Sequence, residues 1–241
     1  MSAAAGTSPS PTRPGGVTVA FCPAPPLLLP EVEGEEAPDT AALRHACAEA
    51  VGALLAPGPG VVLVVGDGVP PGVRFGDGDA ASLRGLGLDA ELPFAGRVRP
   101  GGRAVPLAHG LGARLLDEAG HSGTRVGVGP ADVAPLLRDL PGTVGVLAMG
   151  DGSARRSVKA PGYLDPAAEP FDEAVAAALA SGDAAALAAL DEAEGARLLA
   201  AGVPVWRAVG AALTGRAITG RLHAQVAPYG VGYLVADWTV A

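Results

Sequence analysis

Residues 143–149 read Thr-Val-Gly-Val-Leu-Ala-Met and are followed at once by Gly-Asp-Gly-Ser at 150–153. A short apolar run between turn-forming residues predicts a buried strand that ends in a tight loop. Two other stretches have the same form: Val17 to Cys22 is halted by prolines, and Val61 to Val65 ends at Gly66-Asp67-Gly68. Strands that are apolar on both faces are typical of parallel sheets covered by helices.

The stretches between these strands show helical patterns. Apolar side chains recur at helical spacing from Thr40 to Leu55, and again at Leu107, Leu111 and Leu115 before Gly120. Further helices are predicted at 131–140, 171–180, 184–201 and 205–213, and further strands at 125–128, 222–226 and 231–240. Strands that alternate with helices predict an α/β fold, with a central, largely parallel or mixed sheet and helices on both faces.

The predicted organisation is a disordered leader at residues 1–16 and a single domain at 17–241. Residues 69–104 are rich in glycine and weakly patterned, so they predict an irregular excursion of the chain. Loops of this length are uncommon unless they are functional or disordered.

Composition narrows the class of protein. The 241 residues include 17 Lys and Arg against 25 Asp and Glu, a net charge of −8, which disfavours nucleic acid as a partner. No apolar stretch reaches the ~18 residues of a membrane span, and two cysteines do not make a disulfide framework. We expect a cytoplasmic protein with a small-molecule ligand; whether it forms a homo-oligomer or works with a second protein stays open.

Ligands of open α/β sheets bind outside the carboxyl ends of the strands. That rule selects the loops at 22–27, 66–69 and 150–156. The polar side chains expected to contact a substrate there are Asp67, Asp151, Ser153, Arg155 and Tyr229. The glycine loops lack the endings of a phosphate loop, a nucleophile elbow or a dinucleotide fingerprint, so none of these is predicted.

Among the four histidines, His109 is the candidate acid–base residue. It lies at the start of a predicted helix, where the helix dipole disfavours the imidazolium and leaves a neutral ring that can accept a proton. A purely structural role is the alternative. His45 is interpreted as a surface residue, His121 as a turn residue, and His223 as a buried, hydrogen-bonded histidine of a strand; no two have metal-ligand spacing.

Four segments together carry a resemblance to a known family. They read Phe-Cys-Pro-Ala-Pro-Pro-Leu-Leu at 21–28, Met-Gly-Asp-Gly-Ser-Ala-Arg-Arg at 149–156, Ala-Pro-Gly-Tyr-Leu-Asp at 160–165 and Ala-Pro-Tyr-Gly-Val-Gly-Tyr at 227–233. With them, nearly the whole chain after the leader resembles the LigB-like family of class III extradiol ring-cleavage dioxygenases, in its actinobacterial subfamily. The resemblance implies that family's α/β fold.

The resemblance also implies where an iron site would lie. Active enzymes of the wider superfamily hold Fe(II) with two histidines and a glutamate, which leaves positions for a catechol and O₂. The place of the first ligand holds Ala24, and that of the second holds the Gly66-Asp67-Gly68 turn. The place of a catalytic histidine holds Ala154 or Arg155.

One superfamily element is matched in part. His109-Gly110 resembles the end of an Asp-His-Gly motif near the substrate, with Ala108 in place of the acid. Because alanine cannot ligate iron, the usual Fe(II) set looks incomplete, although Asp67 with Glu31 or Asp151 could form an oxygen-rich site suited to Mg²⁺ or Mn²⁺.

Three functions therefore stay open. The first is a dioxygenase-like protein without the usual Fe(II) ligands, as a pseudoenzyme. The second is an active oxidoreductase or other metal-dependent enzyme on a small aromatic or anionic substrate, with His109 as the acid–base residue and Arg155 as the anion contact. The third is a non-catalytic binding or interaction module.

Overall fold

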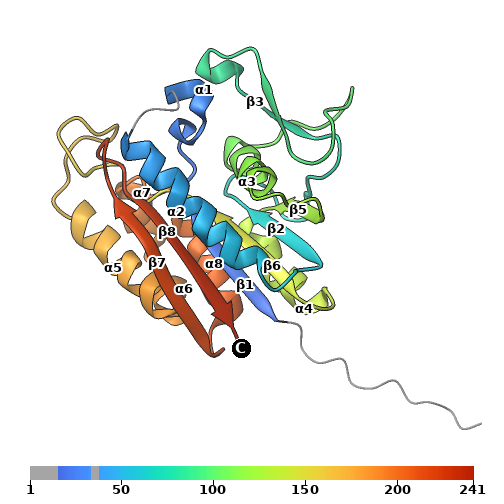
Figure 1. Cartoon of the computed structure of the whole chain (residues 1–241). Coiled ribbons are helices and arrows are strands. Elements are labelled where there is room, and N and C mark those ends of the chain that lie inside the picture. Colours follow the sequence, from blue (N-terminus) through green and yellow to red (C-terminus); the bar gives the residue numbers. More distant parts are fainter. Residues whose placement is uncertain (1–15, 34–37) are drawn as a thin grey trace, which may run out of the picture.

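Six strands form the central sheet of the computed structural model, which describes residues 16–33 and 38–241 (Figure 1). The strands lie in the order β5-β2-β6-β1-β8-β7. Their bounds are β1 Val17–Cys22, β2 Val61–Val65, β5 Thr124–Val128, β6 Val144–Met149, β7 Ile218–Val226 and β8 Tyr233–Val240. Except for Gly16, the leader predicted at 1–16 lies outside the described residues.

The sheet is mixed. The four strands β5, β2, β6 and β1 are parallel, β8 is antiparallel to β1, and β7 is antiparallel to β8. The predicted α/β fold with a largely parallel or mixed sheet is therefore confirmed. The three apolar stretches that the sequence singles out are the central strands β2, β6 and β1, which lie side by side.

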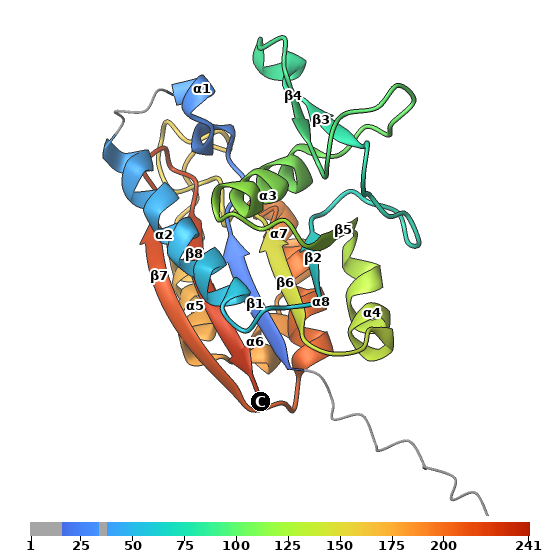
Figure 2. The same cartoon turned by 45° about the vertical axis from the view of Figure 1, so that its right-hand side comes forward.

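Helices cover both faces of the sheet (Figure 2). One face packs against α2 (Pro38–Leu55) and α3 (Leu107–Glu118). The other packs against α4 (Val133–Asp139), α5 (Ala168–Ser181), α6 (Ala184–Ala188) and α8 (Val203–Leu213). The short helices are α1 (Pro30–Glu33), α7 (Glu192–Arg197) and the 3-10 turns η1 (Pro26–Leu28), η2 (Arg84–Leu86) and η3 (Pro130–Asp132).

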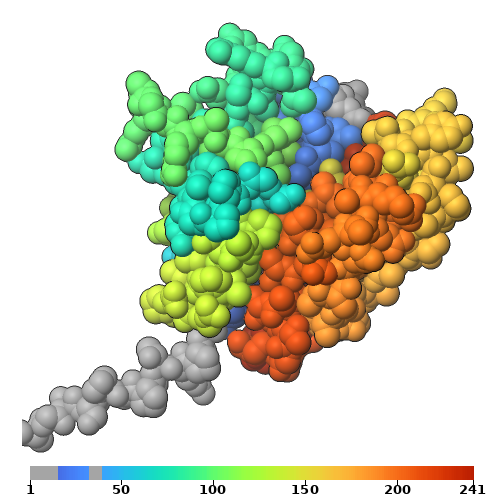
Figure 3. Space-filling model, turned by 180° about the vertical axis from the view of Figure 1, so that it is seen from behind, coloured from blue at the N-terminus to red at the C-terminus, as the bar shows by residue number. Residues whose placement is uncertain are grey.

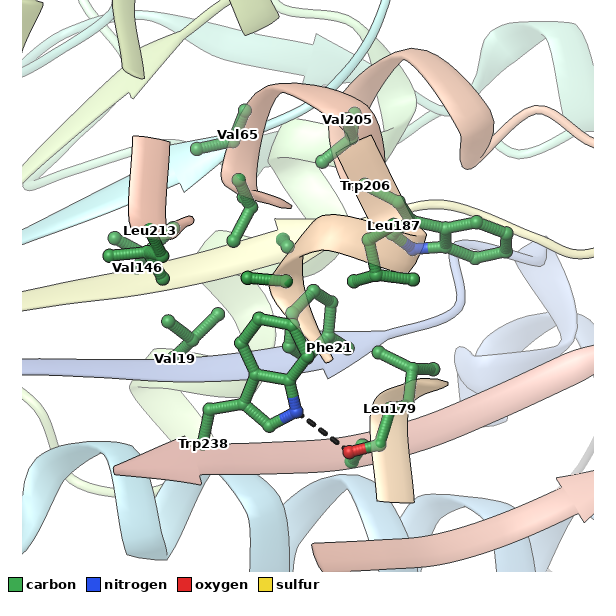
Figure 4. Close-up of a cluster of buried hydrophobic side chains, with 14 of the residues drawn as sticks. Val19, Phe21, Val65, Val146, Leu179, Leu187, Val205, Trp206, Leu213 and Trp238 are labelled. Atoms are coloured by element: carbon green, nitrogen blue, oxygen red, sulfur yellow. Dashed lines mark hydrogen bonds between the residues drawn. The ribbon is translucent and has the colours of Figure 1, made fainter. Parts of the chain in front are cut away.

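Alternation along each strand divides the core into two layers. In β1, Val19 and Phe21 face the α5–α8 side, whereas Ala20 and Cys22 face α2. On the α5–α8 side, Phe21 and Trp238 meet edge to face with ring centroids 4.8 Å apart. The indole Nε1 of Trp238 donates a hydrogen bond to the Leu179 carbonyl at 2.7 Å, which satisfies its one polar group (Figure 4).

The glycine-rich excursion after β2 folds around one buried carboxylate. It contains the two-stranded sheet β3 (Ala80–Ser82) and β4 (Glu91–Pro93). Asp79 accepts hydrogen bonds from the backbone N–H of Gly76 at 3.0 Å and of Arg103 at 2.7 Å. Burial alone would raise the pKa of the Asp79 carboxyl, but these bonds and the Arg103 guanidinium hold it below its usual value.

The single helix predicted at 184–201 is wrong, because the structure has two short helices there, α6 and α7. The side chain of Asp191 accepts hydrogen bonds from the backbone N–H of Ala193 and Glu194, and so caps a new helix start. After α7, Leu199 adopts a left-handed backbone with φ of 57°. The apolar repeat continues through these interruptions, so the pattern alone does not reveal them.

Within the described part of the chain, no helix has both the length and the apolar character needed to cross a membrane.

Candidate functional site

The loop after β6 lies at a switch point of the sheet. The strands on either side of it, β1 and β2, lead to α2 and α3 on one face, whereas β6 leads to α5 on the other. Chains that leave neighbouring parallel strands toward opposite faces open a crevice at the carboxyl ends, where ligands of such folds bind. At this edge the backbone N–H of Gly150 donates to the Cys22 carbonyl at 3.0 Å, so the predicted loops after β1 and β6 do meet.

Asp151 lies in the loop after β6, at this edge of the sheet, and is mostly buried. Its Oδ1 accepts a hydrogen bond of 2.7 Å from the backbone N–H of Ala24. Burial raises the pKa of the Asp151 carboxyl to about 6, and the hydrogen bond from Ala24 opposes this only in part. A carboxylate thus bonds to the backbone at the position where the family resemblance places the first iron ligand.

The raised pKa predicts a specific pH dependence of stability. In the unfolded chain an Asp titrates near ~4, so between about pH 4 and pH 6 the folded protein binds more protons, and its stability falls as the pH rises. The rise of the Asp151 pKa from about 4 in the unfolded chain to about 6 in the folded protein corresponds to a loss of about 3 kcal/mol of folding stability at high pH. Asp151→Asn keeps an acceptor for Ala24 but removes the charge.

We therefore expect the stability difference between Asp151→Asn and the wild type to grow in favour of the variant by about 2–3 kcal/mol as the pH rises from 4 to 8. Urea unfolding across this range measures the gain. A difference between the two proteins that stays constant with pH would show that Asp151 does not titrate in this way.

A pocket of about 560 Å³ opens beside the crevice, between the loop after β2 and the helices α7 and α8. On the face seen in Figure 3, the cyan surface of the segment after β2 borders the orange surface of α7 and α8. The pocket wall is largely apolar and includes Ala196, Leu199, Ala200, Val203 and Pro204. Asp67 and Glu192 add carboxylates. Its size and lining are those of a small-molecule site.

Ser153 is fully buried and is bonded to a partner that the sequence did not reveal. Its hydroxyl donates to Oδ2 of Asp172 at 2.7 Å, and its backbone N–H donates to Oδ1 at 2.8 Å. Nη1 of Arg156 donates to the same Oδ2 at 3.2 Å. Burial raises the pKa of the Asp172 carboxyl, and these bonds oppose the rise. Ser153 therefore fixes the loop after β6 to α5.

Arg155 stands beside the pocket, and Tyr229 does not line it. A Cβ atom added at Gly162 would lie 2.7 Å from Cγ of Arg155 and 2.6 Å from Cδ1 of Leu199, so the Arg155 stem packs next to a pocket wall. Tyr229 is exposed, and its neighbour Gly230 packs on Ala160.

His109 is wholly buried behind the loop that carries Asp67. Its Nε2 lies 2.9 Å from the Val128 carbonyl, which can only accept, so Nε2 carries the proton. A Cβ atom added at Gly66 would lie 2.7 Å from the His109 Cε1, so the ring packs directly under Gly66. Burial lowers the pKa of His109, and the hydrogen bond to Val128 opposes this. Burial therefore favours the neutral ring, the form expected from the sequence.

The other histidines lie away from the pocket. His45 is exposed on α2, and His121 follows Gly120, whose φ is 74°. The side chain of His223 is buried in β7, with Nε2 2.6 Å from Asp237 and Nδ1 3.4 Å from Glu49.

The donor set does not fit Fe(II). Ala24 has no side-chain donor, and within residues 16–33 and 38–241 no three His, Cys, Asp or Glu side chains gather as a metal site. Glu31 instead pairs with Arg114 at 3.6 Å and lines a different cleft, beside β4. Glu31 therefore does not join Asp67, and among the described residues no group of three donors forms around Asp67 or Asp151.

Of the sequence-predicted residues, Asp67 alone lines the pocket, with Arg155 next to it. The Asp151 carbonyl accepts a hydrogen bond from Gly202, which lies between the lining residues Ala201 and Val203. His109, Ser153 and Tyr229 do not join them in one cleft. The sequence does not reveal the wall formed by α7 and α8, because the pattern at 184–201 predicts one continuous helix and tertiary packing brings both helices to Asp67. Asp191 before Glu192, a capping residue before an acidic first turn, was the available signal.

Comparisons with known proteins do not assign the chain: no protein-family model matches it, and no curated protein matches it.

Proposed function

We propose that this protein binds a small organic molecule at the carboxyl edge of its sheet, as a dioxygenase-like protein whose iron-ligand positions no longer supply iron donors. The pocket between Asp67 and the start of α8 carries the proposal. It lies where α/β sheets bind ligands, and its volume and apolar wall suit a small molecule.

The residues at the positions expected to hold or flank the iron disfavour ring cleavage. A facial iron site needs three protein donors around one ion. Here Ala24 contributes only its backbone N–H, which donates to Asp151, and His109 is buried behind Gly66. The family resemblance and the donor set together favour a pseudoenzyme that binds a ligand over a ring-cleaving oxygenase. Two free thiols, Cys22 and Cys47, support a cytoplasmic location.

A pocket-filling variant tests the proposal. Ala196 is exposed on α7 and lines the pocket, so Ala196→Trp is expected to fill the pocket without disturbing the core. A ligand-observed NMR screen of small organic compounds should find binders to the wild type that weaken at least tenfold in the variant. Ala193→Trp, on the same helix but outside the pocket lining, is the matched control and should bind as the wild type does.

Anaerobic loading with Fe(II) separates binding from catalysis. We expect less than one iron per chain and no catechol cleavage on addition of O₂. Binders that are unaffected by Ala196→Trp, or cleavage that appears with stoichiometric iron, would overturn the proposal.

A further inference from the structure

We infer that the pocket selects an organic cation: a small apolar amine whose ammonium group pairs with Asp67. This inference rests on the proposed function and adds the chemical class of the ligand. Three features of the pocket support it: an unbalanced carboxylate, an apolar wall, and a lack of groups that could hold an anion.

Asp67 supplies an unbalanced negative charge. It is exposed in the turn between Gly66 and Gly68, and in the part of the chain that the structure describes it has no ion pair and no side-chain hydrogen bond. The other carboxylate of the pocket, Glu192, is paired with Nε of Arg207 at 2.8 Å. A ligand in the pocket therefore meets one uncompensated carboxylate, which attracts a cation.

The start of α8 cannot offset this charge by binding an anion through its first amides. The backbone N–H of Gly202 already donates to the Asp151 carbonyl at 2.8 Å, and that of Val203 donates to the Ala200 carbonyl at 3.2 Å. Pro204 has no N–H. Of the first three residues at this helix start, two thus have engaged amides and the third has none, which disfavours a phosphate or carboxylate there.

The nearby cations do not line the pocket. The Arg155 stem packs at Gly162 next to Leu199, and Arg197 is paired with Asp165 and Glu194. Neither belongs to the pocket lining. Of the small aromatic or anionic substrates expected from the sequence, this arrangement disfavours the anionic ones, for which Arg155 is the predicted contact.

The wall defines the rest of the ligand. Ala196, Leu199 and Val203 present apolar surface, so an alkyl or phenyl body gains free energy by leaving water there. The ion pair with Asp67 is open to solvent and contributes modestly, about 1 kcal/mol or less. An amine should therefore bind about twofold to fivefold more tightly than its neutral isostere.

Three probes of one shape test this inference: 3-phenylpropylamine, 3-phenylpropanol and 3-phenylpropanoate. Dissociation constants are measured by NMR titration on the wild type, Asp67→Asn, and Glu173→Gln, which removes an exposed carboxylate of α5 outside the pocket. We expect the wild type to bind the amine about two to five times more tightly than the alcohol, and the acid most weakly. Asp67→Asn should erase the preference for the amine and leave the alcohol unchanged; Glu173→Gln should change neither.

The other outcomes separate the cation preference from the binding function. If the alcohol or the acid binds the wild type as tightly as the amine does, or more tightly, the cation preference is wrong. The binding function still stands in that case, provided that Ala196→Trp blocks the binding. A preference for the amine that survives in Asp67→Asn also overturns the cation preference. If no probe binds the wild type, both proposals fail. Because alcohol binding by Asp67→Asn reports an intact pocket, misfolding of that variant cannot be mistaken for lost selectivity.

Discussion

Trp238→Ala should lower the free energy of unfolding by about 3–5 kcal/mol, the range for removing a large buried aromatic side chain. Trp238 is 1% exposed in β8, packs edge to face on Phe21, and donates a hydrogen bond to the Leu179 carbonyl. Its loss would leave a cavity between the sheet and α5. Because aromatic residues are only 4% of the chain, few other large side chains can fill the gap. Urea unfolding measures the change.

Trp238→Phe separates packing from hydrogen bonding. Phenylalanine keeps much of the ring area but leaves the buried Leu179 carbonyl without this donor, which should cost about 1–3 kcal/mol. Val158→Ala, at an exposed position, should change stability by less than about 0.5 kcal/mol. If Trp238→Ala proved no more destabilising than Trp238→Phe, the Trp238 ring would not contribute to stability by packing in this core layer.

Asp172→Ala should be comparably severe, at about 3–5 kcal/mol, because it removes the buried acceptor that a partly buried cation and two other donors share. The carboxylate of Asp172 accepts from the backbone N–H and hydroxyl of Ser153 and from Arg156. The effect should reach the loop after β6, since these bonds hold it against α5. Chemical denaturation gives the stability, and amide exchange at Gly152 and Ser153 reports on the loop.

Glu169→Ala is the matched control for Asp172→Ala. Glu169 also pairs with Arg156, but its side chain is 64% exposed, so its loss should cost less than about 1 kcal/mol. Similar losses from the two variants would mean that Asp172 acts as a surface charge and not as the buried acceptor of this network.

The central strands could be predicted almost to the residue because glycine and proline bound each apolar run. The segments at 17–22, 61–65 and 143–149 all lie in the sheet, and the helices that begin near 40 and 107 were predicted as well. Sequence could not reveal that β6 lies between β1 and β2, because strand order is a property of long-range pairing. It also missed β3 and β4, which are three residues each and lack an alternating pattern long enough to read.

The sequence predicts the edge of the sheet at which the candidate site lies, but not the residues that form the wall of its pocket. The rule that ligands bind at the carboxyl ends of strands led to Asp67 and Asp151, which lie at that edge. The pocket wall comes from α7 and α8, far along the chain from Asp67, and only tertiary packing brings them together. Asp172 did leave a signal: it is a charged residue at helical spacing between Ala168 and Val175, on the apolar side of α5.

The most direct measurement is a backbone amide NMR titration of the isotopically labelled protein with 3-phenylpropylamine. We expect saturable shift changes that cluster at Asp67 and along residues 195–203, the two sides of the pocket. Shifts that cluster elsewhere, or none at millimolar probe, would contradict the claim that this edge of the sheet is a small-molecule site.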